Sequence, residues 1–238
     1  MPGDPVLSDM NALPHVPGTS ELDNLFDITL NPDTSHNWEM ISLGLEEPLP
    51  SQDVMDELHH LYFENVHPSM PIIHRPRYFV ALNSTRNMQP PICLRYIIWS
   101  LAAAISDKYC TLHDHFYKQA RKYLEMDEMK ASGEYFTSAA HCQCLVLMCT
   151  YEYSRMYLPR SWLTMERAAG LAKMLALDRL DAQWHGMRQC IPPAKGFAEK
   201  EERRRIFWGV YCADRSSSMA TGWSMSIDDV DVGVNGSG

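Results

Sequence analysis

The fold is decided by the most apolar stretch of the sequence, Pro90-Pro91-Ile92-Cys93-Leu94-Arg95-Tyr96-Ile97-Ile98-Trp99-Ser100-Leu101-Ala102-Ala103-Ala104-Ile105-Ser106. Proline suits the first turn of a helix, where its missing N–H needs no partner. The two prolines therefore predict a helix that begins near Ile92 and runs to about Ser106. This run is shorter than the about 20 apolar residues that a membrane-spanning helix needs, and it contains Arg95. We interpret it as a core helix of a soluble intracellular protein.

Helical periodicity continues on both sides of this stretch. Apolar residues recur at intervals of about 3.6 residues. They predict further helices over residues 54–66, 113–126 and 135–153, from an N-cap at Ser161 to about Leu175, and from Ala198 to a C-cap at Gly222. Prolines interrupt the connector at residues 68–76 and the loop at residues 181–196, so neither is expected to be helical. No alternating strand pattern of useful length occurs, and the predicted fold class is all-α.

Acidic residues are concentrated at the N-terminus. The net charge is −9, yet residues 1–74 contain thirteen Asp or Glu and no Lys or Arg. Residues 1–50 are also rich in proline and carry bulky apolar residues such as Leu25, Phe26 and Trp38. Acids interleaved with apolar residues are typical of disordered activation segments, which nucleic acid would repel. We expect a disordered acidic segment at residues 1–50, which either recruits a partner or has no function, and a helical domain at residues 51–238.

Neither disulfides nor a metal site is expected. Of the seven cysteines, five lie in apolar stretches and are predicted to be buried, reduced thiols: Cys93, Cys142, Cys144, Cys149 and Cys212. The cluster His141-Cys142-Gln143-Cys144 is the most metal-like. On a helix its two thiols point about 200° apart and cannot share an ion, so the better interpretation is small apolar side chains in a core.

The remaining candidate ligands are also given structural roles. His59, His60, His67 and His74 are expected at the surface or in helix caps, and His113 and His115 have the same unsuitable spacing as the two thiols. The acids Asp228, Asp229 and Asp231 lack the rest of a calcium-loop pattern and are expected to cap a turn.

Catalytic and nucleic-acid-binding patterns are absent from the sequence. It contains no Gly-x-Ser-x-Gly elbow, phosphate loop or Gly-x-Gly-x-x-Gly fingerprint, and we identify no catalytic residue. The basic run Arg203-Arg204-Arg205 directly follows Glu201-Glu202, so it is nearly neutral locally. A DNA-binding surface needs a larger uncompensated basic patch. These observations disfavour both an enzyme and direct sequence-specific DNA binding.

Three segments carry a family resemblance. The first is Leu61-Tyr62-Phe63-Glu64-Asn65-Val66-His67-Pro68 with Pro71-Ile72-Ile73-His74-Arg75-Pro76. The second runs from Ser161-Trp162-Leu163 to Leu177-Asp178-Arg179. The third is Glu202-Arg203-Arg204-Arg205-Ile206-Phe207-Trp208-Gly209-Val210-Tyr211, followed by Asp214-Arg215 and Ile227-Asp228-Asp229-Val230-Asp231. In this order, across about residues 52–231, they resemble the middle regulatory domain of fungal zinc-cluster transcription factors of the xylanolytic-activator type.

The residues of these segments have structural roles in our interpretation. The motif residues are Trp162, Arg203, Arg204, Arg205, Phe207, Trp208, Asp214 and Arg215. We expect Arg204 and Arg205 to pair with acids, and Phe207, Trp208 and Tyr211 to pack inward. Asp214 and Arg215 either anchor a neighbouring element through bidentate hydrogen bonds or form a solvated pair at a helix end.

The resemblance implies a nuclear regulator of transcription by RNA polymerase II. Its partners would be the transcription machinery or a related zinc-cluster regulator, and a small metabolite could bind between helices near Trp99, Tyr151 or Trp162. The family's zinc sits in a six-cysteine DNA-binding cluster, for which this sequence has no counterpart, so DNA would be reached only through a missing module or a partner. We therefore expect no cofactor in this chain and no membrane contact.

The C-terminal end departs from the family pattern. Where the pattern continues into further helices, this sequence reads Val232-Gly233-Val234-Asn235-Gly236-Ser237-Gly238, so a C-terminal truncation is expected. Two alternatives stay open: a modulator that does not bind DNA and pairs with a full-length relative, and, less favoured, a helical enzyme of a biosynthetic gene cluster.

Overall fold

The computed structural model describes residues 49–181 and 190–228. The chain divides into the units Met1–Ser51 and Gln52–Gly238, and every helix below belongs to the second unit. These residues form helices, turns and loops without a strand, which confirms the all-α prediction for the described part. Within the same ranges, each helix is too short or too polar to cross a bilayer. The predicted disorder of residues 1–50 falls almost wholly outside the described residues.

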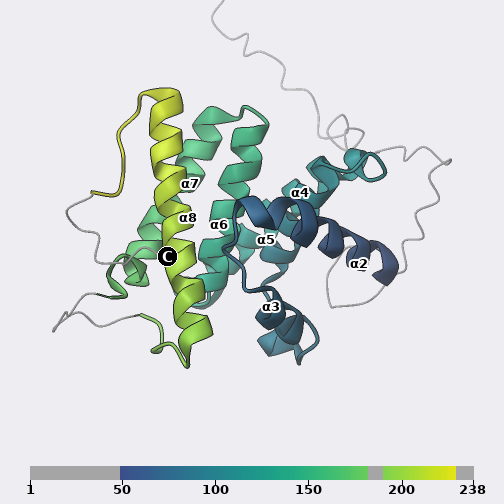
Figure 1. Ribbon diagram of the computed structural model, residues 1–238, viewed down its shortest axis with the longest axis horizontal. Helices are drawn as coiled ribbons and strands as arrows, with labels where there is room; N and C mark the ends of the chain where they lie inside the picture. Colours follow the sequence, from purple (N-terminus) through teal and green to yellow (C-terminus); the bar gives the residue numbers. More distant parts are fainter. Residues whose placement is uncertain (1–48, 182–189, 229–238) are drawn as a thin grey trace, which may run out of the picture. The chain divides into compact units, whose positions relative to one another are not determined.

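Seven α-helices follow one another along the described chain (Figure 1). They are α2 (Gln52–Leu61), α3 (Arg75–Leu82), α4 (Ile92–Ala104), α5 (His113–Met129), α6 (Ala139–Ser154), α7 (Leu158–Met174) and α8 (Phe197–Thr221). A π-helical turn, Tyr62–Val66, and a 3-10 turn, His67–Ser69, extend α2, and further 3-10 turns are Arg86–Met88, Cys110–Leu112, Lys130–Gly133 and Leu177–Arg179.

Helix α4 is the centre of the core, as its apolar sequence predicts. Every side chain from Cys93 to Ala103 is buried. The helix packs against α2, α5 and α6, and Trp99, Tyr96 and Phe116 of α5 are among the largest fully enclosed or nearly enclosed side chains. The one charged residue of the run, Arg95, is buried with its guanidinium 5.4 Å from the centre of the Trp99 ring. A cation over an aromatic face explains how this charge is accommodated in the core.

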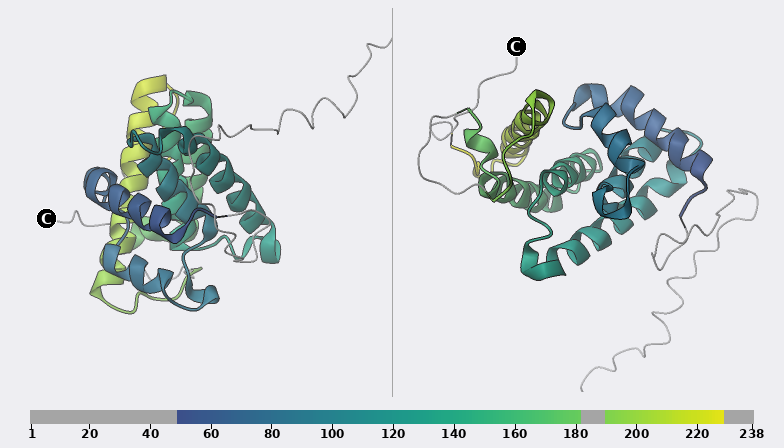
Figure 2. Two further views of the ribbon diagram at one scale, coloured as in Figure 1. Left: turned by 90° about the vertical axis from the view of Figure 1, so that its right-hand side faces the viewer. Right: turned by 90° about the horizontal axis from the view of Figure 1, so that it is seen from below.

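Helices α6, α7 and α8 pack together beside α4. Figures 1 and 2 show these three side by side, with α2 and α3 on the other side of the domain. Small residues on α7, such as Ala168, Ala169 and Ala172, are buried in this packing. On α8, Gly209 faces Ile72 of the connector, and an added Cβ would lie 2.8 Å from Ile72 Cγ2. Glycine is therefore what allows α8 to approach the connector this closely.

The prediction that residues 68–76 are not helical is wrong at its C-terminal end. Helix α3 begins at Arg75. The side chain of His74 caps it by accepting a hydrogen bond from the Arg77 N–H, and Pro76 lies in the first turn. Here proline starts a helix rather than interrupting one, because the first turn has no use for its N–H.

Two other predicted helix starts are displaced. Helix α6 begins at Ala139 rather than residue 135, because the backbone of Ser138 is extended and its side chain caps the helix by accepting from the His141 N–H. Helix α7 begins at Leu158 rather than at Ser161, with Pro159 in its first turn. Ser161 is not a cap but a buried residue whose hydroxyl donates to the Cys149 carbonyl at 3.1 Å.

Other local predictions are confirmed. Gly222 ends α8 with a left-handed φ of 74°, and its N–H donates to the Ser218 carbonyl at 2.8 Å. Cysteines 93, 142, 144 and 149 are buried free thiols, as expected. The prediction for Cys212 is wrong, because this thiol is exposed. It lies on the outer face of α8, whereas Val210 and Asp214 face inward.

Candidate regulatory site

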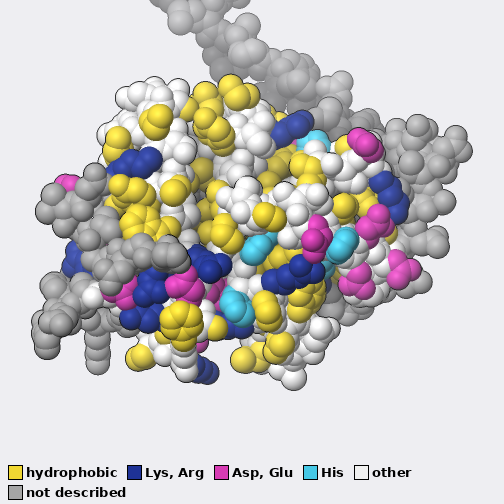
Figure 3. All heavy atoms as spheres, in the orientation of Figure 1, with side chains coloured by type: hydrophobic (Ala, Val, Ile, Leu, Met, Phe, Trp, Pro, Cys, Tyr) yellow, Lys and Arg dark blue, Asp and Glu magenta, His cyan; other side chains and the backbone are white. Residues whose placement is uncertain are grey.

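The three consecutive arginines near the start of α8, Arg203–Arg205, are each paired with acids. Arg203 is buried and donates to Glu199 Oε1 at 2.7 Å, and Arg205 donates to Glu201 Oε1 at 3.1 Å. Both pairs are four residues apart, the spacing that brings side chains together on one helix face. In Figure 3 basic and acidic side chains are intermingled over this part of α8. The prediction that the run is locally compensated is confirmed.

Arg204 makes the longest-range contact of the run. Its Nε and Nη2 hold Asp181 in a bidentate pair at 3.0 and 2.9 Å, while Nη1 donates to Glu201 at 2.5 Å. Asp181 and Glu201 together raise the pKa of the Arg204 guanidinium above its ordinary value. Lys200 also reaches Asp181 at 2.8 Å. Arg204 therefore links Asp181, which follows the Leu177–Arg179 turn after α7, to the start of α8.

The aromatic residues of α8 differ in burial. Phe207 is fully buried, as expected. Trp208 and Tyr211 are only partly buried, so the prediction that both pack inward holds in part. Their rings lie edge to face at 5.3 Å on the side of α8. Trp208 lines a surface groove with Met70 and Ile72 of the connector.

Asp214 and Arg215 anchor the segment that follows α8. The fully buried Asp214 carboxylate accepts hydrogen bonds from the backbone N–H groups of Ser226 at 3.0 Å and Ile227 at 3.1 Å. Arg215 donates to Asp214 Oδ2 and to the Ile227 carbonyl, each at 2.9 Å. Of the two interpretations of this pair, the anchor is the one that the structure supports.

Trp162 lies on the surface of α7 rather than in the core. Its ring meets Trp223 edge to face, with centroids 5.5 Å apart and planes at 79°. Together with Pro159, Leu163 and Ser224, the two tryptophans line an open apolar hollow of about 480 Å³.

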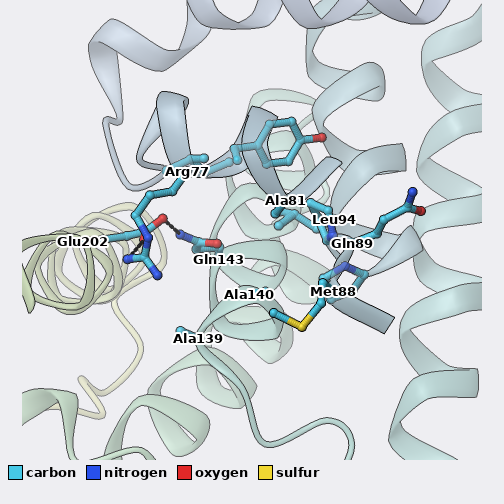
Figure 4. A pocket seen from close by; sticks show the side chains of 13 residues that line it. Arg77, Ala81, Met88, Gln89, Leu94, Ala139, Ala140, Gln143 and Glu202 are labelled. Carbon is cyan, nitrogen blue, oxygen red and sulfur yellow. Dashed lines mark hydrogen bonds and ion pairs between the residues drawn. The ribbon is translucent and has the colours of Figure 1, made fainter. Parts of the chain in front are cut away.

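A second hollow, of about 240 Å³, is lined by residues of α3, α4, α6 and α8 and of the segment before α4 (Figure 4). Its apolar wall includes Met88, Leu94 and Ala140. Trp99 and Tyr151, which we expected beside a ligand, are instead enclosed in the core and do not line it.

Glu202 organises the polar side of this cavity. Its Oε2 accepts from Arg77 Nη1 at 2.7 Å, and its Oε1 accepts from Gln143 Nε2 at 3.1 Å and from the His74 N–H at 3.0 Å. Gln143 also donates to the Ile72 carbonyl at 2.9 Å. One carboxylate on α8 is thereby joined to α3, α6 and the connector, as the dashed lines in Figure 4 show in part. The cavity combines an apolar wall with a few convergent polar groups, the composition that small-molecule sites have.

Glu202 begins the third segment of the family resemblance, but the sequence did not predict its role or its partners. Gln143 stands between two cysteines on the buried side of a mainly apolar helix. A buried amide needs a hydrogen-bond partner, so its position was a readable signal that something polar faces α6. The identity of that partner, 59 residues away in sequence, was not.

The histidines occupy mixed environments. His60 is exposed and His74 caps α3, as expected. The prediction for His59 is wrong, since this residue is buried between Tyr78 and Trp99. Its Nε2 lies 2.9 Å from the Tyr78 hydroxyl and accepts from Trp99 Nε1 at 3.2 Å. Burial, with the charge of Arg95, lowers the His59 pKa to about 4. Among the acids expected in a turn, Asp229 and Asp231 lie outside the described residues.

Residues 60–235 match the family described as "Fungal specific transcription factor domain". Similar proteins include the "Citrinin biosynthesis transcriptional activator mrl3" of Monascus ruber, 30% identical over 187 residues that cover 79% of this chain and 36% of that protein. Another is the "Asperfuranone cluster transcription factor afoA" of Emericella nidulans, 33% identical over 190 residues that cover 73% of this chain and 28% of that protein.

The chain thus spans about a third of the length of these relatives. No solved structure matches it. The family match extends over most of the chain, including α3, α4, α6 and α8 around the cavity and the anchor at the end of α8. This chain belongs to the fungal-specific transcription factor domain family.

Proposed function

We propose that the chain is the regulatory part of a nuclear transcription regulator. The observation that carries this proposal is the family match over residues 60–235, together with relatives named as transcriptional activators or transcription factors of biosynthetic clusters. The sequence contains no six-cysteine cluster, so contact with DNA is assigned to another module or to a partner. The family and the relatives are named for transcription and not for catalysis, and we assign the chain no enzymatic activity.

A tethering assay tests this proposal. Residues 1–50, residues 51–238 and the whole chain are each fused to an unrelated DNA-binding domain and tested on a reporter in a fungal host. We expect residues 1–50 to activate the reporter through their acidic and apolar composition, and residues 51–238 to reduce that activation or make it conditional. The expression of each fusion and the nuclear fluorescence of a tagged copy serve as controls. If all three fusions are expressed and nuclear but leave the reporter silent, the activator proposal is removed.

We assign the sensing of a small metabolite to the cavity around Glu202. A ligand with a hydrogen-bond donor or a positive charge would compete with Arg77 and Gln143 for this carboxylate, while its apolar part would lie against Leu94 and Met88. Because Glu202 joins α8 to α3 and α6, such competition would alter the contacts of α8. This gives a physical route from ligand binding to a change in the exposed surface.

Thermal-shift screening with amino compounds, sugars and polyketide-like metabolites tests the sensing function. A ligand of this cavity is expected to raise the Tm of the native chain and to lose that effect in Glu202→Gln. The matched control is Glu64→Gln, which breaks only an exposed ion pair with Arg75. Equal stabilisation of both variants would place the ligand elsewhere.

A second function, pairing with a related regulator, is favoured by the apolar hollow at Trp162. Leu163 and Trp223 beside it are 59% and 41% exposed, and clustered exposed apolar side chains mark interaction surfaces. Co-purification with a full-length relative from the same host tests this pairing. Leu163→Asp should abolish it, whereas Val80→Asp, a change at a residue 71% exposed on α3, should not. Equal losses in both variants, or none in either, would exclude this hollow as the interface.

A further inference from the structure

Three potential metal ligands meet in the core, one from each of three helices. They are Cys93 in the first turn of α4, Asp127 in the last turn of α5 and His141 in the first turn of α6. All three are buried, and their donor atoms lie within 4.8 Å of one another. His141 Nε2 is 3.1 Å from Asp127 Oδ2, and Cys93 Sγ is 3.8 Å from the same oxygen.

These separations suit a tetrahedral zinc ion. Zinc binds sulfur at about 2.3 Å and nitrogen or oxygen at about 2.0–2.2 Å, which places neighbouring donors of a tetrahedron about 3.3–3.7 Å apart. The two observed separations, 3.1 and 3.8 Å, lie on either side of this range. For these two pairs, shifts of a few tenths of an ångström in side-chain position are enough to admit the ion.

The surroundings hold the ligands in the orientation that metal binding needs. Ser138 Oγ lies 2.8 Å from His141 Nδ1, so the other ring nitrogen, Nε2, faces the cluster. Lys130 donates to Asp127 Oδ1 at 2.6 Å and leaves Oδ2 directed at Cys93 and His141. Metal-binding histidines and carboxylates are commonly oriented by such outer hydrogen bonds.

Cys144 is the fourth candidate ligand. It lies three residues after His141, on the same face of α6, and its buried thiol neighbours that of Cys93. It lies outside the group of three donors that are within 4.8 Å of one another, so its side chain would have to move toward the other three to bind the ion. Cys142 and Cys144 diverge on α6, as their spacing predicts. The donors beside His141 come instead from α4 and α5, which the sequence does not place next to α6.

We propose that Cys93, Asp127, His141 and Cys144 bind one zinc-type ion that ties α4, α5 and α6 together. Thiolate and imidazole ligands favour zinc over magnesium or calcium. On binding, each thiol releases its proton to solvent. Two thiolates and one carboxylate then exceed the charge of the dication by one, and the Lys130 ammonium beside Asp127 balances that charge.

The test measures metal binding by the full-length chain, reduced and freed of metal. The exposed thiols are first removed in a Cys110→Ser, Cys190→Ser, Cys212→Ser background to exclude adventitious binding. After dialysis against zinc we expect about one zinc ion per chain by elemental analysis, since a structural site holds one ion. Cobalt should give a thiolate-to-metal charge-transfer band and the visible spectrum of a tetrahedral ion.

Variants then locate the ion. Cys93→Ser and Cys144→Ser should each lose part of the charge-transfer intensity, and the double variant all of it. Cys142→Ser, which changes a buried thiol of α6 that contacts the Ala168 carbonyl, should keep the full intensity. A chelator should lower the Tm of the zinc-loaded chain. This measurement uses the chain with all four ligands in place, so it does not depend on whether a ligand variant folds. Absence of bound zinc and of a cobalt charge-transfer band in the folded chain would leave only a hydrogen-bonded His–Asp pair and overturn the proposal. Full binding by folded Cys93→Ser would do the same.

Discussion

Gly209→Ala probes how closely α8 approaches the connector. An alanine Cβ would lie 2.8 Å from Ile72 Cγ2 and 3.6 Å from Val146 Cγ1. The nearer atom belongs to a β-branched side chain with a restricted χ1, and the Ile72 carbonyl is held by Gln143. The methyl group therefore cannot move aside without shifting the connector.

The magnitude follows from two opposing contributions. Alanine stabilises a helix interior by about 1 kcal/mol relative to glycine, and inserting a methyl group into a filled core costs about 1–3 kcal/mol. Gly209→Ala should thus lower the free energy of unfolding by about 1 kcal/mol net. Gly170 of α7 is the matched control, because an added Cβ there meets nothing within 4 Å. Gly170→Ala should raise the free energy of unfolding by about 1 kcal/mol.

Urea unfolding followed by far-ultraviolet circular dichroism measures both changes. Ile72→Ala removes the clashing methyl group, so in that background Gly209→Ala should become neutral or stabilising. This double-variant cycle separates the contact from helix propensity. Equal stabilisation by Gly170→Ala and Gly209→Ala in the parent chain would refute the reasoning, since it would show that the connector yields at no cost.

Three further outcomes are expected. Asp214→Asn keeps the side-chain shape but replaces a charged acceptor of two backbone N–H groups, so the amides of Ser226 and Ile227 should exchange hydrogen faster and stability should fall by about 2 kcal/mol; unchanged exchange would contradict the anchor. His59 has a folded-state pKa of about 4 against an ordinary 6.5, beside Tyr78 and Arg95, so its contribution should be complete above pH 6.5 and lost as the pH falls to 4. The loss should reach about 3 kcal/mol; a comparison of unfolding free energies across this range with those of His59→Gln tests it. A thiol reagent should modify Cys110, Cys190 and Cys212 in the native chain and the other four cysteines only after unfolding; rapid modification of more than three would show that the core opens.

The sequence predicted the features that depend on residues close together in the chain, namely helices and ion pairs within one helix. Helix α4 followed from its apolar run, and the pairs of Arg203 and Arg205 followed from helical spacing. Prolines were the main source of error. A proline after a polar connector can end one helix or begin the next. Which of the two occurs depends on whether a residue before the proline can serve as the N-cap of the following helix. His74 caps α3 with its side chain, and an aromatic residue, Tyr157, precedes α7, so neither start resembled the usual Ser, Thr, Asp or Asn signal.

The sites depend on a different kind of information, namely which buried polar residues face one another. Gln143, His141, Asp127 and Glu152 are all buried in helices whose other inward residues are apolar or aromatic. Each one is visible in the sequence as a polar residue at a core position, where it must find a partner because an unsatisfied buried polar group is costly.

The partners come from other helices in every case. Gln143 meets Glu202 of α8, His141 meets Asp127 of α5, and Glu152 receives the Tyr117 hydroxyl at 2.5 Å and Arg121 at 2.6 Å. Apolar packing alone tolerates rotation and sliding of one helix against another, whereas these hydrogen bonds are satisfied in one register only. The polar residues of α6 therefore specify how α5 and α8 are positioned against it. Both proposed sites adjoin α6, one through Gln143 and the other through His141. A ligand at Glu202 or an ion at His141 would therefore act on the contacts that set this arrangement.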